Sequence, residues 1–335
     1  MSYRSETIST AVGRINREYF LPAIQREYVW KPEQIIQLFD SIMRGYPISS
    51  FLFWDLNPEN RENWEIYKFI DAFKLGGVHN QIASTHGIQN CTLVLDGQQR
   101  LTSLMIGLKG TYAIRKQGRQ KKSPDRYSLH LNLLADPYTE SEDPESGIYY
   151  KFAFMLPERV PRKDEDNYWF PVGKILDFDE IRKLETYIDV VVENELPTIT
   201  QSRTTKRLFE RNIERLYKAV HEDEVIAYYT EHDQDYDRVL DIFVRANEGG
   251  TKLSKSDLLL SMITLNWGDI NARDEIYNFL DYINTQLTRG TCKTPIPCLI
   301  FRILGRIMRC GRAISGKMKF SKSHRTPAKW ILFHA

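Results

Sequence analysis

The sequence predicts an α+β protein in which a mixed α/β domain precedes a mostly helical domain. The first observation is a short apolar run at residues 91–95, typical of a buried strand, followed by apolar residues at helical spacing over 101–108. The second is the alternation of apolar and polar residues over 127–133 and 149–154, which predicts further strands of one sheet. The third is the helical spacing that prevails from about residue 179 onward.

At 335 residues, the chain is long enough for about two domains. We place their boundary near residue 175, so that residues 1–175 form the α/β domain and residues 176–290 form the helical domain. Residues 291–335 are a basic tail, because eleven Lys and Arg and no acidic residue follow Asp281. The tail is interpreted either as a basic arm that neutralises DNA phosphates or as the end of an interrupted or out-of-frame gene. The sudden loss of acidic residues favours the second interpretation.

The elements before the central strand follow from helix start and stop signals. Pro32 suits the first position of a helix, and the apolar stripe from Ile35 to Met43 defines its buried face. Gly45 ends this helix and Pro47 prevents its continuation. Residues 51–54 then predict a short strand.

After the helix at 101–108, the charged residues 115–126 predict a solvated loop. In the second half of the chain, an apolar stripe over 208–220 predicts one helix and Val239, Ile242 and Phe243 predict another. Between them, residues 225–229 predict one more strand.

The composition is that of a soluble globular protein, with 42% hydrophobic and 27% charged residues. The four cysteines form no C-x-x-C pair and the seven histidines show no metal-ligand spacing, so the sequence predicts neither a disulfide scaffold nor a metal site. No apolar run reaches the length of about 18 residues that spans a membrane, and the first ten residues lack the apolar core of a signal peptide. We therefore expect a cytoplasmic protein without a membrane anchor.

A polar hinge from Asp96 to Arg100 lies where the central strand ends and the next helix begins. Backbone N–H groups and the positive end of the helix dipole converge at such a point and stabilise an anion. Gly97 lets the backbone approach a ligand, and Arg100 adds a planar fork suited to phosphate oxygens. The competing interpretation is a capping box, since Gln99 follows Asp96 by three residues. Spacing alone does not separate the two.

A second polar cluster lies near residues 243–254. Gly249 and Gly250 end a helix, and Ser254 starts the next, which is typical of a simple connection between two helices. Arg245 and Asn247 are an unusual choice for a turn alone, because both side chains make directional hydrogen bonds to ligands.

Three motifs in this order resemble those of one family. They are Gln25-Arg26-Glu27-Tyr28-Val29-Trp30, then Asp96-Gly97-Gln98-Gln99-Arg100-Leu101-Thr102, then Phe243-Val244-Arg245-Ala246-Asn247-Glu248-Gly249-Gly250-Thr251-Lys252-Leu253-Ser254. Residues 10–285 resemble the N-terminal domain of GmrSD-type modification-dependent restriction endonucleases, which is distantly related to the ParB and sulfiredoxin nucleotide-binding fold. The resemblance implies a ParB/sulfiredoxin-like domain that binds and hydrolyses a nucleoside triphosphate with Mg²⁺ and acts on foreign or modified DNA.

In this family the DNA-cleaving module is usually a separate C-terminal HNH-type domain. The present sequence contains no HNH-like cluster of histidine and asparagine. We therefore expect a nucleotide-hydrolysing component coupled to an endonuclease module that this chain lacks, with DNA and a separate nuclease as partners. The sequence G-x-x-x-x-G-K-[ST] is also absent, which excludes a P-loop.

The resemblance and the chemistry of the residues together define a candidate site. The amides of residues 97–99 would hold the triphosphate, Arg100 would balance charge on the transferring phosphate, and Asp96 would hold Mg²⁺ through water or orient the attacking water. The residues assigned to catalysis are Asp96, Gln98, Gln99 and Arg100. The residues assigned to nucleotide binding are Gln25, Arg26, Gly97, Thr102, Arg245, Asn247 and Gly250. Tyr28 and Trp30 would pack beneath the site or stack on a base.

Two other functions remain open at this stage. The domain could bind a nucleotide as a switch that docks a partner or DNA without hydrolysis. Alternatively, its arginines and glutamines could contact nucleic acid directly.

Overall fold

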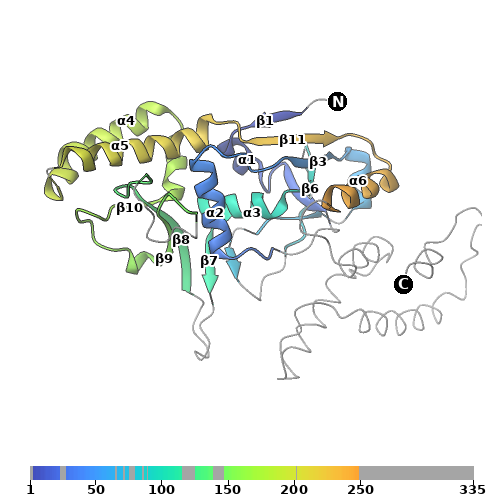
Figure 1. Cartoon of the computed structure of the whole chain (residues 1–335). Coiled ribbons are helices and arrows are strands. Elements are labelled where there is room, and N and C mark those ends of the chain that lie inside the picture. Colours follow the sequence, from blue (N-terminus) through green and yellow to red (C-terminus); the bar gives the residue numbers. More distant parts are fainter. Residues whose placement is uncertain are drawn as a thin grey trace, which may run out of the picture. The chain divides into compact units, whose positions relative to one another are not determined.

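Strand β6 (Thr92–Asp96) lies inside the larger sheet of the computed structural model (Figure 1), as its unbroken apolar run predicts. The structure describes residues 3–22, 28–64, 66–70, 72–74, 80–84, 87–88, 90–114, 125–138, 147–200 and 202–248. All of these residues belong to one compact unit. The predictions made for residues beyond 248, including the basic tail at 291–335, lie outside the described residues.

The larger sheet is mixed. In spatial order its strands are β1 (Arg4–Glu6), β11 (Ile226–Glu231), β3 (Phe51–Asp55), β6, β2 (Tyr19–Pro22) and β4 (Ile66–Tyr67). Strands β11 and β3 are parallel, as are β6 and β2, and the other neighbours are antiparallel. β11, which follows the boundary predicted near residue 175, lies between β1 and β3. Elements from both sides of that boundary therefore share one sheet.

The second sheet contains the strands that the alternating segments predict. Its strands are β10 (Trp169–Pro171), β8 (Asp125–Asn132), β7 (Thr111–Ile114) and β5 (Ala72–Lys74) in spatial order, with β9 (Phe152–Met155) also paired to β8. Strand β9 begins three residues later than the alternation at 149–154 predicts, because the backbone N–H groups of Tyr149 and Tyr150 donate instead to the Asp40 carboxylate at 2.9 and 2.7 Å.

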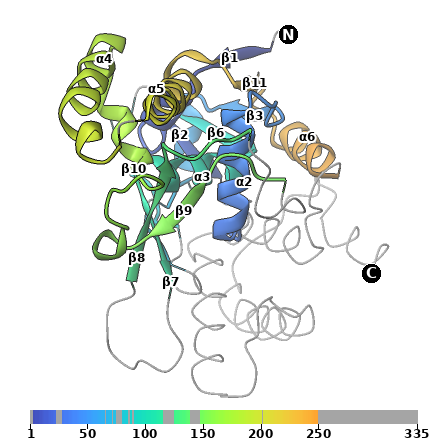
Figure 2. The ribbon, with the colours of Figure 1, turned by 60° about the vertical axis from the view of Figure 1, so that its left-hand side comes forward.

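Six α-helices are described. They are α1 (Ile8–Arg14), α2 (Pro32–Met43), α3 (Gln98–Leu108), α4 (Ile181–Val190), α5 (Arg203–Tyr217) and α6 (Tyr236–Glu248). Helix α2 starts at Pro32 as predicted and ends two residues before Gly45, whose φ of 73° is left-handed. Helices α4 and α5 lie side by side in the views of Figures 1 and 2.

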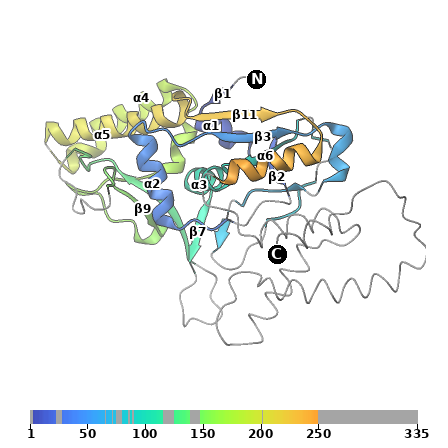
Figure 3. The ribbon, with the colours of Figure 1, turned by 45° about the vertical axis from the view of Figure 1, so that its right-hand side comes forward.

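The larger sheet is buried on both faces, and β6 shows why. Val94 points to the main core, which also holds residues of α1, α2 and α3. Leu93 and Leu95 point to the other face, where they share a second apolar cluster with Val239 and Phe243 of α6. Figure 3 shows α6 alongside this sheet. A strand buried on both faces carries apolar residues at successive positions, which explains the unbroken run in the sequence.

The ladder between β3 and β6 contains one irregularity. Leu52 is opposite Asp96 and Phe53 is opposite Val94, so the register shifts between Leu52 and Phe53. Leu95 is therefore an extra residue in β6, as in a β-bulge. The bulge lies one residue before the end of the strand.

A pair of glycine substitutions tests the packing of α3. A Cβ on Gly173 would lie 2.3 Å from the carbonyl oxygen of Leu108, a backbone atom that cannot rotate away. We expect Gly173→Ala to lower the free energy of unfolding by about 1–3 kcal/mol, as overpacking does. Nothing lies within 4 Å of a Cβ on Gly13 in α1, so Gly13→Ala should stabilise the protein by about 0.5–1 kcal/mol. Urea unfolding of both variants checks this, and equal effects would contradict the described packing.

Candidate functional site

The hinge lies between β6 and α3, as the sequence predicts. Strand β6 ends at Asp96, and Gly97 follows as the N-cap of α3 with φ 92° and ψ 6°, in the left-handed region. A Cβ at this position would also lie 2.1 Å from Cδ1 of Phe51. Glycine is therefore required here both by the backbone conformation and by the close packing of the Phe51 ring.

The start of α3 has no side-chain cap among the described residues, since Gly97 is the N-cap and no side chain bonds there. Asp96 is thus not the N-cap that the capping-box interpretation requires. The Gln99 side chain bonds to another segment of the chain: its Oε1 accepts a hydrogen bond from the N–H of Val29 at 3.0 Å. The Gln99 side chain therefore joins the helix to the segment that contains the first motif.

Further contacts fix the end of the first motif against α3. The Tyr28 hydroxyl lies 2.8 Å from Oγ of Ser103, which in turn donates to the carbonyl of Gln99 at 2.7 Å. The hydroxyl of Tyr112 donates to the carbonyl of Trp30 at 3.3 Å. Burial raises the pKa of Tyr28 above its ordinary value, because the phenolate would lose its solvation, so this hydroxyl stays protonated.

Tyr28 therefore packs beneath the hinge, one of the two roles expected for it. Gln25 and Arg26 lie outside the described residues. Tyr28 and Val29, at the described end of the first motif, bond to Ser103 and Gln99 of α3, so this end of the first motif meets the second motif.

The Arg100 guanidinium is held by backbone carbonyls. Its Nη1 donates to the carbonyl of Ile48 at 2.5 Å and its Nη2 to that of Ser50 at 2.9 Å. Nη2 also lies 3.4 Å from Oδ2 of Asp96, and the guanidinium carbon lies 4.4 Å from the centre of the Phe51 ring. Burial lowers the pKa of Arg100 and the Asp96 carboxylate opposes this shift. Arg100 thus binds the chain just before β3 to the start of α3.

The other predicted residues of the second motif differ in exposure. The Asp96 side chain is 36% exposed and that of Arg100 is 15% exposed. Gln98, Gln99 and Thr102 are buried, with 3–7% of their surface exposed. Asp96 is therefore the most accessible of the residues assigned to catalysis.

The third motif begins on α6. Arg245 is 75% exposed and its Nε lies 3.0 Å from Oδ2 of Asp241, one turn earlier. Phe243 shares the second apolar cluster with Leu95, so the helix that carries this motif packs on the strand that carries the hinge. The side chain of Asn247 and all of Gly250 lie outside the described residues. The meeting of all three motifs around one ligand stays a prediction.

A cavity of about 260 Å³ adjoins the hinge. Arg100 and Trp30 line it together with Gln34, Gln37 and Ser41 of α2. The sequence indicated only the apolar stripe of α2, and these polar residues were not among the predicted site residues. Their spacing of three and four residues, which places them on one face of the helix, was the signal available.

Two properties of the described residues bear on other site types. No group of three or more His, Cys, Asp or Glu side chains among them is arranged to hold a metal ion. Within the same part of the chain, every helix is too short or too polar to cross a membrane.

The fold and hinge define an α+β chain in which a buried strand leads through a left-handed glycine into a helix. Residues 8–264 match the family model described as "GmrSD restriction endonuclease, N-terminal domain", and the chain belongs to this family. It is therefore related to components of restriction systems. An uncharacterized protein of Methanocaldococcus jannaschii is 31% identical over 119 residues, a match that covers 36% of this chain and 19% of that protein.

Alanine substitutions at Gly87 and Gly97 distinguish the cost of a left-handed backbone from the cost of close packing at the hinge. Gly87 has a φ of 81° and no atom within 4 Å of an added Cβ, whereas Gly97 combines a φ of 92° with the contact to Phe51. We expect Gly87→Ala to cost about 1 kcal/mol, the penalty of the left-handed backbone alone. Gly97→Ala should cost at least about 2–3 kcal/mol, because overpacking adds to that penalty. Thermal unfolding of the two variants measures the difference, and similar melting temperatures would refute the packing of Phe51 against Gly97.

The contacts of Arg100 predict a structural cost for its removal. Arg100→Ala should lower the free energy of unfolding by about 2–4 kcal/mol, because the partly buried carbonyl of Ile48 loses a charged donor that contributes about 1.5–3 kcal/mol and the exposed carbonyl of Ser50 loses a weaker one. Arg245→Ala is the matched control, since an exposed ion pair contributes about 0.2–1 kcal/mol. If Arg100→Ala unfolds like the wild type in urea, the described hydrogen bonds do not stabilise the fold.

Proposed function

We propose that this chain is the nucleotide-binding and nucleotide-hydrolysing component of a restriction system that acts on foreign or modified DNA. The triphosphate, with Mg²⁺, would bind at the start of α3, and a separate nuclease would cut the DNA. The observation that carries the proposal is the turn from β6 through the left-handed Gly97 into α3, beside a partly exposed carboxylate, Asp96, in a member of this restriction family.

The start of α3 suits an anion for a physical reason. The first N–H groups of a helix have no carbonyl partner within the helix, and the helix dipole adds positive potential at the same place. No described side chain supplies the usual cap at Gly97. A phosphate bound there would take the place that a Ser or Asp cap occupies in most helices.

Asp96 suits the hydrolytic step. It lies at the end of β6 next to the proposed phosphate site, and its carboxylate could hold Mg²⁺ through water or orient the attacking water. Arg100 would supply a fixed positive charge close to the transferring phosphate. Its bonds to Ile48 and Ser50 would keep this charge in place without reorganisation during the reaction.

The cavity next to Arg100 could hold the base of the nucleotide. Trp30 offers an aromatic surface there, and Gln34 and Gln37 offer amide groups that both donate and accept hydrogen bonds. Arg100, which we place close to the phosphate, also lines this cavity. Arg245 and Asn247, both on α6, which packs against β6, would approach the same nucleotide from the opposite face of the sheet.

A second candidate function is a nucleotide switch that docks DNA or a partner without hydrolysis. One observation favours it: Oδ2 of Asp96 already lies 3.4 Å from Nη2 of Arg100. This oxygen of the carboxylate is therefore already engaged with a cation instead of Mg²⁺ or the attacking water.

The test of the proposal is phosphate release by the purified chain, with and without DNA, measured beside equilibrium binding of the same triphosphate. We expect Asp96→Asn to reduce kcat by a factor on the order of 10² while triphosphate still binds. The matched control is Asp179→Asn, which removes an exposed carboxylate paired with Lys183 far along the chain. It should hydrolyse at the wild-type rate.

The outcomes separate the candidates. Binding without phosphate release in the wild type supports the switch and contradicts the hydrolase. A wild-type rate for Asp96→Asn removes Asp96 from the mechanism. Absence of triphosphate binding, with DNA present or absent, refutes both candidates.

A further inference from the structure

A second cavity, of about 430 Å³, lies at the other end of β6 from the hinge. The hinge begins with Asp96, the last residue of the strand, whereas Thr92, its first residue, and Cys91 just before it line this cavity. None of the residues assigned to the hinge contributes to the lining. The lining residues that the argument uses are Arg4, Arg61, Asp55, Asn57, Asn90 and Thr92.

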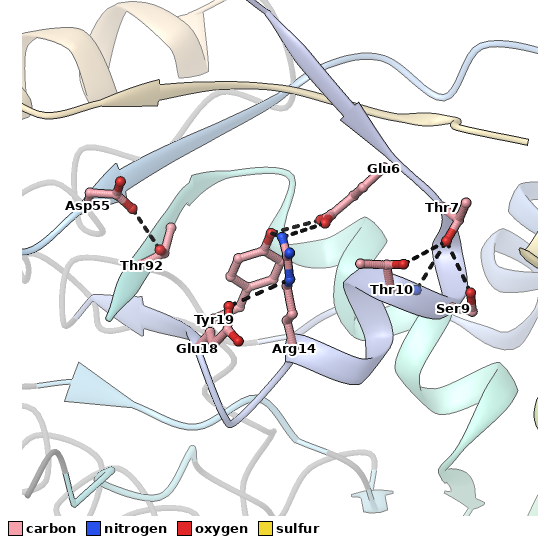
Figure 4. A network of polar contacts seen from close by, with 9 residues as sticks. All are labelled: Glu6, Thr7, Ser9, Thr10, Arg14, Glu18, Tyr19, Asp55 and Thr92. Atoms are coloured by element: carbon pink, nitrogen blue, oxygen red, sulfur yellow. Dashed lines mark hydrogen bonds and ion pairs between the residues drawn. The ribbon is translucent and has the colours of Figure 1, made fainter. Parts of the chain in front are cut away.

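The floor of the cavity is a polar continuation of one sheet face. Phe53 on β3 points to the main core, and Asp55, two residues later, points to the same side of the sheet. Thr92 of β6 is directly opposite Asp55 and donates a hydrogen bond from Oγ1 to its Oδ1 at 2.7 Å. Figure 4 shows this pair on neighbouring strands. The face thus changes from aromatic to hydrogen-bonding where the helices no longer cover it.

One wall of the cavity is held by a partly buried network of hydrogen bonds and ion pairs around Arg14. Nη1 of Arg14 donates to Oε2 of Glu6 at 2.8 Å and to the Tyr19 hydroxyl at 3.1 Å, and that hydroxyl donates to Oε1 of Glu6 at 2.8 Å (Figure 4). Glu18 lies 3.6 Å from Nε of Arg14. The Arg14 guanidinium is therefore paired with Glu6, Tyr19 and Glu18, and we assign it a structural role in the cavity wall rather than a role in ligand binding.

Two other arginines line the cavity. Arg61 is 8% exposed and donates from Nη1 to the carbonyl of Ile88, which fixes its guanidinium beside the cavity. Arg4, on the edge strand β1, is exposed. Asp55, also in the lining, is half-exposed and accepts from Thr92 with one oxygen while the other lies 3.2 Å from Nδ1 of His232.

This combination selects the chemistry of the ligand. Guanidinium groups bind phosphate oxygens, whereas the Asp55 carboxylate and the amides of Asn57 and Asn90, which line the same cavity, suit a group that both donates and accepts hydrogen bonds. A phosphate ion alone would leave Asp55 facing like charge and would fill a small part of 430 Å³. A ligand with a phosphate at one end and a polar planar group at the other satisfies both sets of side chains.

We propose that this cavity binds one nucleotide unit, with its phosphate on Arg4 and Arg61 and the edge of its base on Asp55 and the neighbouring amides. The unit is either a free mononucleotide or a nucleotide of DNA turned out of the helix, since both present the same phosphate and base edge. Asp55 accepts hydrogen bonds from amino groups, so bases that carry an amino group are preferred. This site is separate from the triphosphate site proposed at the hinge.

The first experiment is calorimetric titration of the full chain with matched mononucleotides. CMP and UMP differ at C4, where CMP carries an amino group, and GMP and IMP differ at the 2-amino group. We expect the amino-bearing member of at least one pair to bind about tenfold more tightly, as one good base contact provides. Ribose 5-phosphate, which has no base, should bind more weakly than either. Equal binding of ribose 5-phosphate and the nucleotides would refute the base-reading site.

Variants locate the site. Asp55→Asn keeps an oxygen to accept from Thr92 but replaces an acceptor by a donor, so it should abolish the preference for amino-bearing bases without loss of fold. Arg4→Ala should weaken all mononucleotides by about tenfold, because a charge-assisted hydrogen bond to phosphate is lost. Arg159→Ala, an exposed arginine outside the lining, is the control and should change neither. Unchanged binding and preference in both test variants would overturn the proposal.

The second experiment distinguishes the source of the nucleotide. In a DNA duplex that contains 2-aminopurine, fluorescence rises when the base leaves the stack. A rise on addition of the wild-type chain that Arg4→Ala and Asp55→Asn suppress assigns the site to DNA. Mononucleotide binding without such a rise assigns it to a free nucleotide. Absence of both signals refutes the site. Arg4→Ala should retain the wild-type rate of triphosphate hydrolysis, and loss of that rate would contradict the separation of the two sites.

Discussion

The ring of Phe51 is the contact on which the hinge depends. On one side it packs so closely on Gly97 that a Cβ could not fit, and the Arg100 guanidinium lies over it at 4.4 Å from the ring centre. The same guanidinium bonds to the carbonyls of Ile48 and Ser50, just before Phe51 in the chain. The turn from β6 into α3 is therefore held to the start of β3 by one aromatic residue and one cation.

The sequence was sufficient for those parts of the fold that depend on local periodicity. The apolar run before Asp96 and the stripe of α2 correspond to β6 and α2 because burial on two faces and on one face produces different patterns. The parallel pairing of β11 with β3 could not be predicted, since pairing between two distant segments produces no local pattern in the sequence. The likeness to ParB and sulfiredoxin folds stays a prediction.

The candidate site was predicted less completely. The position of the hinge followed from the change of period after Arg100, but the partners of Arg100 did not, because main-chain carbonyls accept hydrogen bonds whatever residue carries them. For the same reason the bond between Gln99 and the N–H of Val29 had no signature in the sequence. Asp55 and Thr92 were missed because their pairing depends on the register of two strands rather than on spacing along one.

The extra residue in β6 has a consequence for the direction of Asp96. Residues on a strand alternate between faces, so an inserted position exchanges the faces of everything that follows it. Asp96 is the first residue after Leu95, and Gly97 and α3 come next. With regular pairing after Val94, Asp96 would lie opposite Phe51, on the face of the main core. Because Leu95 is inserted, Asp96 is instead opposite Leu52, which shares the second apolar cluster with residues of α6. The orientation of the hinge is thus determined by strand length, counted in single residues, as much as by the identity of its side chains.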